Sequence, residues 1–137
     1  MKIEMVPIGR LVPYARNARV HDEAQIAALA DSIRAYGFNA PVLIDTKGGI
    51  IAGHGRVMAA QRLACQKVPC IRLAHLTEAQ KRAYIIADNK LAEKSRWDLD
   101  ILRNEVEELL DAGAEAGLLA FDDEEIDRLI NEYTTDL

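Results

Sequence analysis

The chain has 137 residues, 50% of them apolar and 28% charged, a composition typical of a soluble globular protein rather than a disordered or fibrous one. No segment holds the roughly 20 consecutive apolar residues that a membrane-crossing helix needs, and the first residues lack the apolar core of a secretory signal, so we expect a cytoplasmic protein without membrane contact. The net charge of -5 is divided unevenly: residues 1–95 hold 14 Lys and Arg against 8 Asp and Glu, whereas residues 96–137 hold 3 against 14. The basic charge of residues 1–95 suits a polyanionic ligand. The acidic residues 96–137 are expected to form a solvated helical tail.

The first third of the chain predicts a strand, a loop, a helix and a hairpin. Residues 2–7 predict a short strand, and the Pro- and Asn-containing stretch 11–19 predicts a loop. Asp22, followed three residues later by a glutamine, predicts the start of an amphipathic helix that ends at Gly37. The two apolar runs within residues 41–52 predict the strands of a hairpin.

The middle of the chain predicts two helices separated by a strand. A helix is expected from about residue 56 to residue 63, and the apolar run 68–73 predicts the next strand. Thr77 and the glutamine three residues later form a capping-box pattern for a helix that is expected to end near Ala87. Residues 88–90, Asp-Asn-Lys, are expected to interrupt this helix or to lie at its end.

The acidic end predicts two further helices. Apolar residues at helical spacing within 99–110 follow Trp97 and Asp98, and a linker rich in small residues follows at 112–117. A last short helix is expected from Asp123 to about Glu132.

The stretch Ile50–Ala60, "IIAGHGRVMAA", is the strongest candidate for a functional site. A strand that ends in Gly53-His54-Gly55-Arg56 and turns directly into a helix brings together backbone N–H groups, the positive end of the helix dipole and a guanidinium. These groups favour an anion such as phosphate. The alternative is a tight connection without a ligand. The spacing does not match a Walker A motif, so a P-loop ATPase is excluded.

Three ordered segments carry a family resemblance. "IIAGHGRVMAA" resembles the phosphate-binding box of the ParB/sulfiredoxin superfamily, which is Gly-Glu-Arg-Arg-x-x-Ala in ParB proteins and Gly-Cys-His-Arg in sulfiredoxins. Upstream, "LVPYARNARVHDEAQIAALADSIRAYGFNAPVLI" is similar to the opening segment of ParB proteins. Downstream, "LTEAQKRAYIIADNKLAE" occupies the place of the ParB Glu-Asn-x-x-Arg box. The sequences "IADNKLAE" and "FDDEEIDRLI" look most like ParB-like segments joined to DNA methyltransferases in phages and bacteria.

The resemblance implies an α+β fold, with a small mixed sheet, packed helices and a helical C-terminal extension. We therefore expect residues 1–95 to form a ParB-like nucleotide-binding domain and residues 96–137 to form an acidic helical extension.

The resemblance also implies a ligand, a nucleoside triphosphate bound with Mg²⁺, with CTP favoured over the other nucleotides. The residues implied in phosphate binding are Gly53, His54, Gly55 and Arg56, with Asn17 and Arg19 from the basic loop. Asp88 and Asn89 stand where the family has its metal-holding Glu-Asn pair, and hard oxygen ligands suit Mg²⁺. Without the resemblance, this Asp-Asn pair is better interpreted as a signal that ends a helix.

The departures from the family motifs bear on catalysis. His54 replaces the sulfiredoxin cysteine, and neither Cys65 nor Cys70 can take its place, so sulfinic acid reduction is not expected. His54 and Gly55 also replace a glutamate and an arginine of the ParB box. These losses affect hydrolysis more than binding, because nothing at the turn positions an attacking water.

Two classes of function follow from the sequence. The first is a nucleotide-binding module in DNA transactions, such as partition, DNA modification or phage functions, with weak or no hydrolysis. The alternative is a metal-dependent enzyme, an NTPase or a ParB-like DNA nuclease, although only Asp88 is well placed as a carboxylate ligand. Catalytic residues are not assigned.

The expected partners are a nucleotide, DNA and a protein partner. Residues 96–137 are too short and too acidic for a helix-turn-helix, so DNA contact by this chain alone is expected to be weak and sensitive to salt. A DNA methyltransferase is one candidate partner domain. The sequence leaves the oligomeric state open, a homodimer included.

Overall fold

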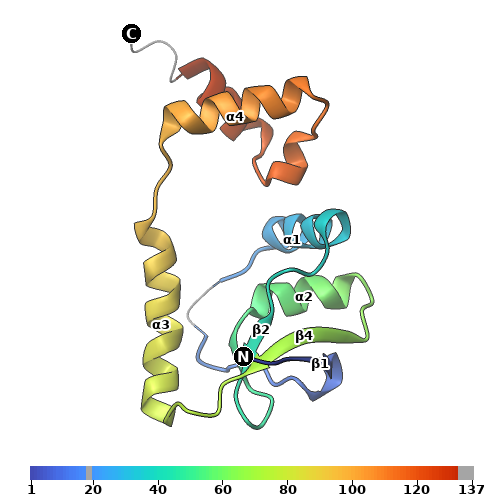
Figure 1. Ribbon diagram of the computed structural model, residues 1–137, viewed down its shortest axis with the longest axis vertical. Helices are drawn as coiled ribbons and strands as arrows, with labels where there is room; N and C mark the ends of the chain where they lie inside the picture. The colour runs from blue at the N-terminus through green and yellow to red at the C-terminus, as the bar shows by residue number, and fades with distance from the viewer. Residues whose placement is uncertain (18–19, 133–137) are drawn as a thin grey trace. The chain divides into compact units, whose positions relative to one another are not determined.

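The computed structural model describes residues 1–17 and 20–132, which divide into two compact units, Met1–Lys94 and Ser95–Leu137 (Figure 1). Within these described residues, no helix combines the length and apolar character that crossing a bilayer requires.

The first unit is built on a four-stranded mixed sheet. Its strands are β1 (Ile3–Pro7), β2 (Val42–Ile44), β3 (Ile50–Ala52) and β4 (Lys67–Arg72). They lie in the order β1-β4-β2-β3, with β2 parallel to β4 and the other two pairings antiparallel. The strands therefore confirm the predicted α+β class with a small mixed sheet.

The described residues of the first unit form three α-helices, α1 (Glu23–Tyr36), α2 (His54–Arg62) and α3 (Glu78–Lys94), of which α2 and α3 pack on the sheet. Side chains of β2 alternate between the two faces of the sheet, as the strand period of two requires. Val42 and Ile44 pack with Val57 of α2 on one face, and Leu43 packs in a cluster with Ile85 of α3 on the other. Helix α1 covers α2 from outside, so the layers run α1, α2, sheet, α3.

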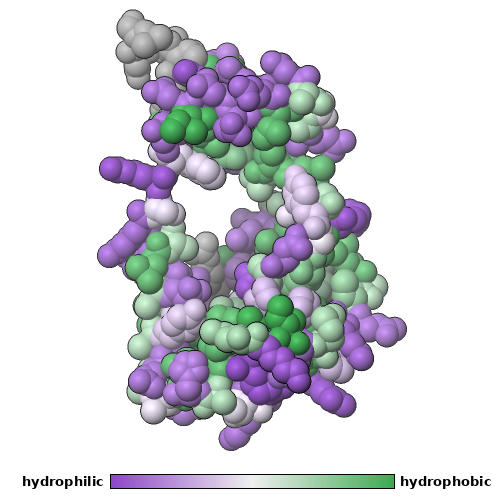
Figure 2. All heavy atoms as spheres, in the orientation of Figure 1, coloured by the Kyte–Doolittle hydropathy of each residue, from purple (hydrophilic) through white to green (hydrophobic). Residues whose placement is uncertain are grey.

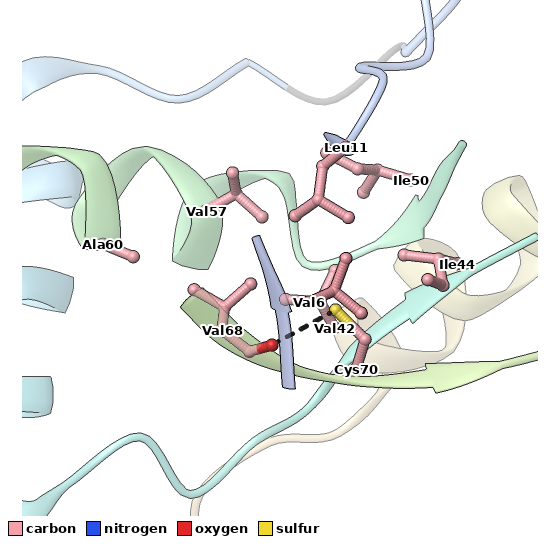
Figure 3. Close-up of a cluster of buried hydrophobic side chains, with 9 residues drawn as sticks. All are labelled: Val6, Leu11, Val42, Ile44, Ile50, Val57, Ala60, Val68 and Cys70. Atoms are coloured by element: carbon pink, nitrogen blue, oxygen red, sulfur yellow. Dashed lines mark hydrogen bonds between the residues drawn. The ribbon is translucent and has the colours of Figure 1, made fainter. Parts of the chain in front are cut away.

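The main core lies between α2 and the sheet. Figure 3 shows its nine buried side chains, which come from all four strands, from α2 and from Leu11. Leu11 follows the short 3-10 helix η1 (Ile8–Arg10). The thiol of Cys70, fully buried here, lies 3.6 Å from the Val68 carbonyl oxygen as a weak donor. Close packing of these side chains fixes where β3 passes into α2.

The helix caps follow the sequence signals, but two helix boundaries do not. The backbone N–H of Gln25 donates to the Asp22 carboxylate at 2.7 Å. Thr77 and Gln80 form the reciprocal capping box that the sequence predicts. Helix α2 begins at His54, two residues before the predicted start.

The prediction that the third helix ends near Ala87 is wrong. Helix α3 continues through residues 88–90 to Lys94. The Asn89 side-chain amide donates to the carbonyl of Ile85, one turn earlier, at 2.8 Å, so this residue is accommodated inside the helix. The residues that follow are mostly good helix formers and allow the helix to continue.

One carboxylate joins the β2–β3 hairpin to α3. Asp45 accepts the backbone N–H groups of Lys47 at 2.9 Å and Gly49 at 2.7 Å, and its second oxygen accepts the Lys81 ammonium at 2.9 Å. Burial tends to raise the pKa of Asp45, but Lys81 and the two amides outweigh burial and hold the pKa below its ordinary value. The side chains of Asp45 and Lys81 are only 20% and 14% exposed, so solvent screens this pair less than a surface ion pair.

The second unit is helical and acidic. It contains α4 (Leu99–Asp111), the 3-10 helix η2 (Ala116–Leu119), α5 (Asp123–Asp127) and a π-helical turn, η3 (Arg128–Glu132). Val106 and Leu129 are buried in it, and the rings of Trp97 and Phe121 lie 6.1 Å apart. Figure 2 shows the visible face of this unit as mainly hydrophilic with scattered apolar side chains. The predicted last helix is thus a short α-helix continued by a π-helical turn.

We predict that Asp45→Ala lowers the free energy of unfolding of the first unit by about 1.5–3 kcal/mol, because it removes hydrogen bonds to a charged group. Urea unfolding followed by amide NMR signals of β2 and β4 measures this change. Asp31→Ala, which breaks the exposed pair with Arg34, is the matched control and should cost about 0.5 kcal/mol or less. Equal losses in the two variants would mean that Asp45 acts as an ordinary surface carboxylate.

Candidate functional site

A cleft of about 230 Å³ lies where β3 passes into α2. Its walls come from the α2 N-terminus, from the start of α1 and from α3. Along it, the structure brings together these sequence-predicted residues: Asn17, Gly53, His54, Gly55, Arg56, Asp88 and Asn89. Arg19, the remaining predicted residue, lies outside the described residues.

Both glycines of the turn meet close neighbours. Gly53 precedes α2 with φ +106°, a conformation that residues with a side chain rarely adopt, and no side chain caps the helix. A Cβ on Gly55 would lie 3.0 Å from Leu29 Cδ1 and 3.1 Å from the His21 ring. The arginine that ParB proteins have at the Gly55 position therefore does not fit here unless His21 and Leu29 move.

Arg56 is a half-buried cation at the helix start. Its Nη2 donates to the Pro41 carbonyl at 3.0 Å, while its Nε is buried without a hydrogen-bond partner among the described residues. Burial lowers the pKa of the guanidinium, and the negative charge of Asp88 opposes this shift. Arginine stays protonated even so. An uncompensated buried donor is costly, and a bound anion would satisfy it.

His54 joins the loop before α1 to the α2 N-terminus. The Tyr14 backbone N–H donates to His54 Nε2 at 3.1 Å, so Nε2 acts as an acceptor. The neutral ring then carries its proton on Nδ1, the nitrogen that remains available as a donor. Burial lowers the pKa of His54, and the charge of His21 lowers it further. The sequence suggested only a donor at this position and did not predict its link to the loop.

Helix α3 supplies the opposite wall. Asp88 is exposed, and Asn89 uses its amide nitrogen to bond Ile85, which leaves its Oδ1 for another partner. Ala92 lies one turn beyond Asp88 on the same face and also lines the cleft. The ParB motif has an arginine at this position, three residues after the asparagine, so a second cationic side chain is missing here.

No group of three His, Cys, Asp or Glu side chains that could hold a metal ion occurs in the described part of the chain. A Mg²⁺ ion at Asp88 and Asn89 would therefore need further oxygens from phosphate and water, which is how Mg²⁺ is commonly held.

Three residues of α1 and its start complete the cleft and were not predicted. They are His21, Gln25 and Leu29. His21 Nδ1 and Gln25 Oε1 lie 2.8 Å apart, so the glutamine side chain pairs with the histidine. A possible signal was the position of His21 and Gln25 on either side of the Asp22 cap, one helical turn apart.

The fold and the cleft define a small α+β domain in which a cleft opens at a helix N-terminus. The profile of the ParB N-terminal domain family matches residues 1–90, and the chain belongs to this family.

Two curated relatives are similar to the chain over part of its length. Over 82 residues the chain is 54% identical to the ParB-like nuclease domain-containing protein YnaK of Escherichia coli. This match spans 60% of the chain and 94% of YnaK. Over 93 residues the chain is 33% identical to the nucleoid occlusion protein of Bacillus thuringiensis, covering 64% of this chain. This match spans only 32% of the nucleoid occlusion protein.

Solved structures of low sequence identity share the fold. The C-terminally truncated chromosome-partitioning protein ParB from Caulobacter crescentus, complexed with CTP-gamma-S, matches with a TM-score of 0.70 at 21% identity, covering 99% of this chain and 88% of that chain. The structure of that protein complexed to the centromeric parS site matches with a TM-score of 0.54 at 21% identity, covering 93% of this chain and 64% of that chain.

We predict that protonation of His54 destabilises the first unit. Because the folded-state pKa is lowered, the contribution of the neutral ring is present above about pH 6.5 and is lost as the pH falls through the folded-state pKa. Urea unfolding between pH 7.5 and 5 should show a smaller loss in His54→Gln than in the wild-type protein. Equal losses in both proteins would contradict this role for His54.

Proposed function

We propose that the cleft binds a nucleoside triphosphate, with CTP preferred, and that the chain is a nucleotide-binding module in DNA transactions. The observation that carries this proposal is the buried Nε of Arg56, which has no hydrogen-bond partner within residues 1–17 and 20–132. It lies at a helix N-terminus that no described side chain caps. An anion offers the missing acceptor, and the helix dipole favours its charge. The preference for CTP is supported by the solved ParB complexed with CTP-gamma-S, whose fold this chain shares.

Each side chain has a distinct part in the proposed phosphate binding. The glycines at 53 and 55 let the backbone approach the phosphates, and the first amides of α2 donate to them. Arg56 donates from Nε while its Nη2 stays on the Pro41 carbonyl, which holds the guanidinium in place. His54 donates from Nδ1. Asn17 and Arg19 are proposed to approach from the loop.

Mg²⁺ is proposed to bind between the nucleotide phosphates and α3. Asp88 supplies a carboxylate, and Asn89 supplies Oδ1, because its nitrogen is engaged with Ile85. When bound, the ion would neutralise phosphate charge. The proposed role of the two side chains is to fix its position.

We infer that hydrolysis is slow. Asp88 keeps the carboxylate of one ParB motif glutamate, but a second glutamate and two arginines are replaced by His54, Gly55 and Ala92. The cleft thus keeps donors for ground-state phosphate but lacks a carboxylate at the turn to orient water and further cations to stabilise the developing charge. The alternative is an enzyme, an NTPase or a nuclease, and the name of the YnaK relative favours the nuclease.

The two parts of the chain are proposed to have different roles. Residues 1–95 form the nucleotide-binding domain, and residues 96–137, net charge -11, form an extension that avoids polyanions and contacts a protein partner. The ParB complexed to parS supports a DNA partner. DNA binding by this chain alone should be weak and sensitive to salt. A DNA methyltransferase partner and a phage context are proposed from the sequence resemblance. A homodimer is compatible with the sequence.

We predict that Arg56→Ala weakens CTP binding by about 1.5–3 kcal/mol, the range for a hydrogen bond to a charged group. Isothermal titration calorimetry measures this loss, with circular dichroism to check the fold and Arg56→Lys as a variant that keeps the charge. Arg62→Ala, at the other end of α2 and in an exposed pair with Glu23, is the matched control and should bind as the wild type does. Unchanged affinity in a folded Arg56→Ala protein would mean that the site lies elsewhere.

We predict that Asp88→Ala removes the enhancement of CTP affinity by Mg²⁺ and leaves metal-free binding unchanged. Titrations with Mg²⁺ and with EDTA measure the two conditions, with Asp31→Ala as control. Equal loss in both conditions would indicate a structural role for Asp88.

Assays of CTP hydrolysis and DNA cleavage with the wild-type and Asp88→Ala proteins distinguish a binding module from an enzyme. A binding module should hydrolyse CTP far more slowly than the roughly 1–1000 per second of typical enzymes and should leave DNA intact. Brisk hydrolysis or DNA cleavage in Mg²⁺, lost in Asp88→Ala, would establish the enzyme instead.

A further inference from the structure

A second cavity, of about 340 Å³, lies beside α3 and has no part in the proposed phosphate binding. Loop residues Tyr14 and Arg16 form one wall, and the other is formed by α3 through Arg82, Ile85, Ile86 and Lys90. Its volume falls within the usual range for small-ligand sites, about 300–1,000 Å³. Asn89 borders both this cavity and the cleft, so the two are neighbours along α3.

The rim of this cavity is cationic and partly unpaired. No ion pair or hydrogen bond of the Arg16 or Arg82 side chain occurs among the described residues, whereas Arg34 and Arg62 each pair with a carboxylate. Lys90 lies 3.4 Å from Glu93, which also lines the cavity, and both side chains are well exposed. The guanidinium groups of Arg16 and Arg82 suit phosphate oxygens, which they can bind through paired N–H donors.

The floor of the cavity is apolar. Ile85 is buried in the cluster that Tyr14 packs against, and Ile86 is 66% exposed beside it. The Tyr14 backbone is held by its hydrogen bond to His54, which fixes the position of this residue. An aromatic ring and two isoleucines next to free arginines form a surface that suits a flat base carrying a phosphate.

We propose that this cavity binds a phosphorylated nucleobase, as one unit of single-stranded nucleic acid or as a free mononucleotide. The base stacks on Tyr14 and the isoleucines, and the phosphate lies between Arg16 and Arg82. This site goes beyond the nucleotide cleft and uses other side chains. Loss of CTP binding in Arg56→Ala and loss of strand binding in Arg82→Gln are separate measurements, so either proposal can fail alone.

Fluorescence anisotropy with a labelled single-stranded oligothymidylate at low salt tests the site in the intact chain. Tyr14→Leu, which keeps an apolar side chain, and Arg82→Gln should each weaken binding about 5-fold or more. Arg82→Gln and Arg16→Gln should each also reduce the slope of log K against log salt concentration by about 0.7. Arg34→Gln, an exposed arginine on α1, is the matched control and should change neither quantity.

Competition separates the sources of the ligand. Displacement of the labelled strand by unlabelled strand but not by thymidine monophosphate assigns the site to nucleic acid, and displacement by the monophosphate assigns it to a free nucleotide. The proposal is overturned if duplex DNA of the same length competes as well as the single strand, because its bases are not accessible. It is also overturned if Arg34→Gln loses as much affinity as Arg82→Gln, or if folded Tyr14→Leu and Arg82→Gln bind as the wild type does.

Discussion

The half-buried guanidinium of Arg56 is the constraint on which the candidate site depends. It is held by the Pro41 carbonyl from one side and packs against the backbone of Gly53, where a Cβ would lie 2.9 Å from its Nη2. Its Nε has no partner among the described residues. A buried donor without an acceptor costs free energy, and folding alone does not recover that cost. The core between α2 and the sheet keeps the guanidinium at this position and stabilises the arrangement.

The two other walls of the cleft are positioned by contacts distant in sequence. Helix α3 is held to the β2–β3 hairpin by the Asp45–Lys81 ion pair and to the sheet by buried Ile85. The loop before α1 is held by the hydrogen bond between Tyr14 and His54. Each contact fixes an element that carries candidate ligand-binding side chains. Weakening either contact should therefore change the site. The Asp45–Lys81 ion pair contains no proposed phosphate-binding residue, and the Tyr14–His54 hydrogen bond contains one, His54.

Much of the fold and part of the site could be predicted from the sequence, because the signals are local. The strand-to-helix turn at Gly53–Arg56 is encoded by four consecutive residues. The cap at Thr77 depends on two residues that are three positions apart. The end of α3 was predicted wrongly because Asn89 bonds the Ile85 carbonyl inside the helix instead of breaking it. The α1 wall with His21 was missed because it meets Gly55 only through tertiary packing. No local pattern encodes a contact between residues so far apart in the chain.

The most direct test of this account is amide NMR on the isotope-labelled chain during titration with CTP and Mg²⁺. If the α2 N-terminus receives the phosphates, the largest shift changes should fall on the backbone N–H groups of His54, Gly55 and Arg56, because these are the first amides of the helix. The side-chain Nε–H signal of Arg56 should move with them as it gains an acceptor. Unchanged signals at these positions, with saturable changes elsewhere in the chain, would contradict the central claim.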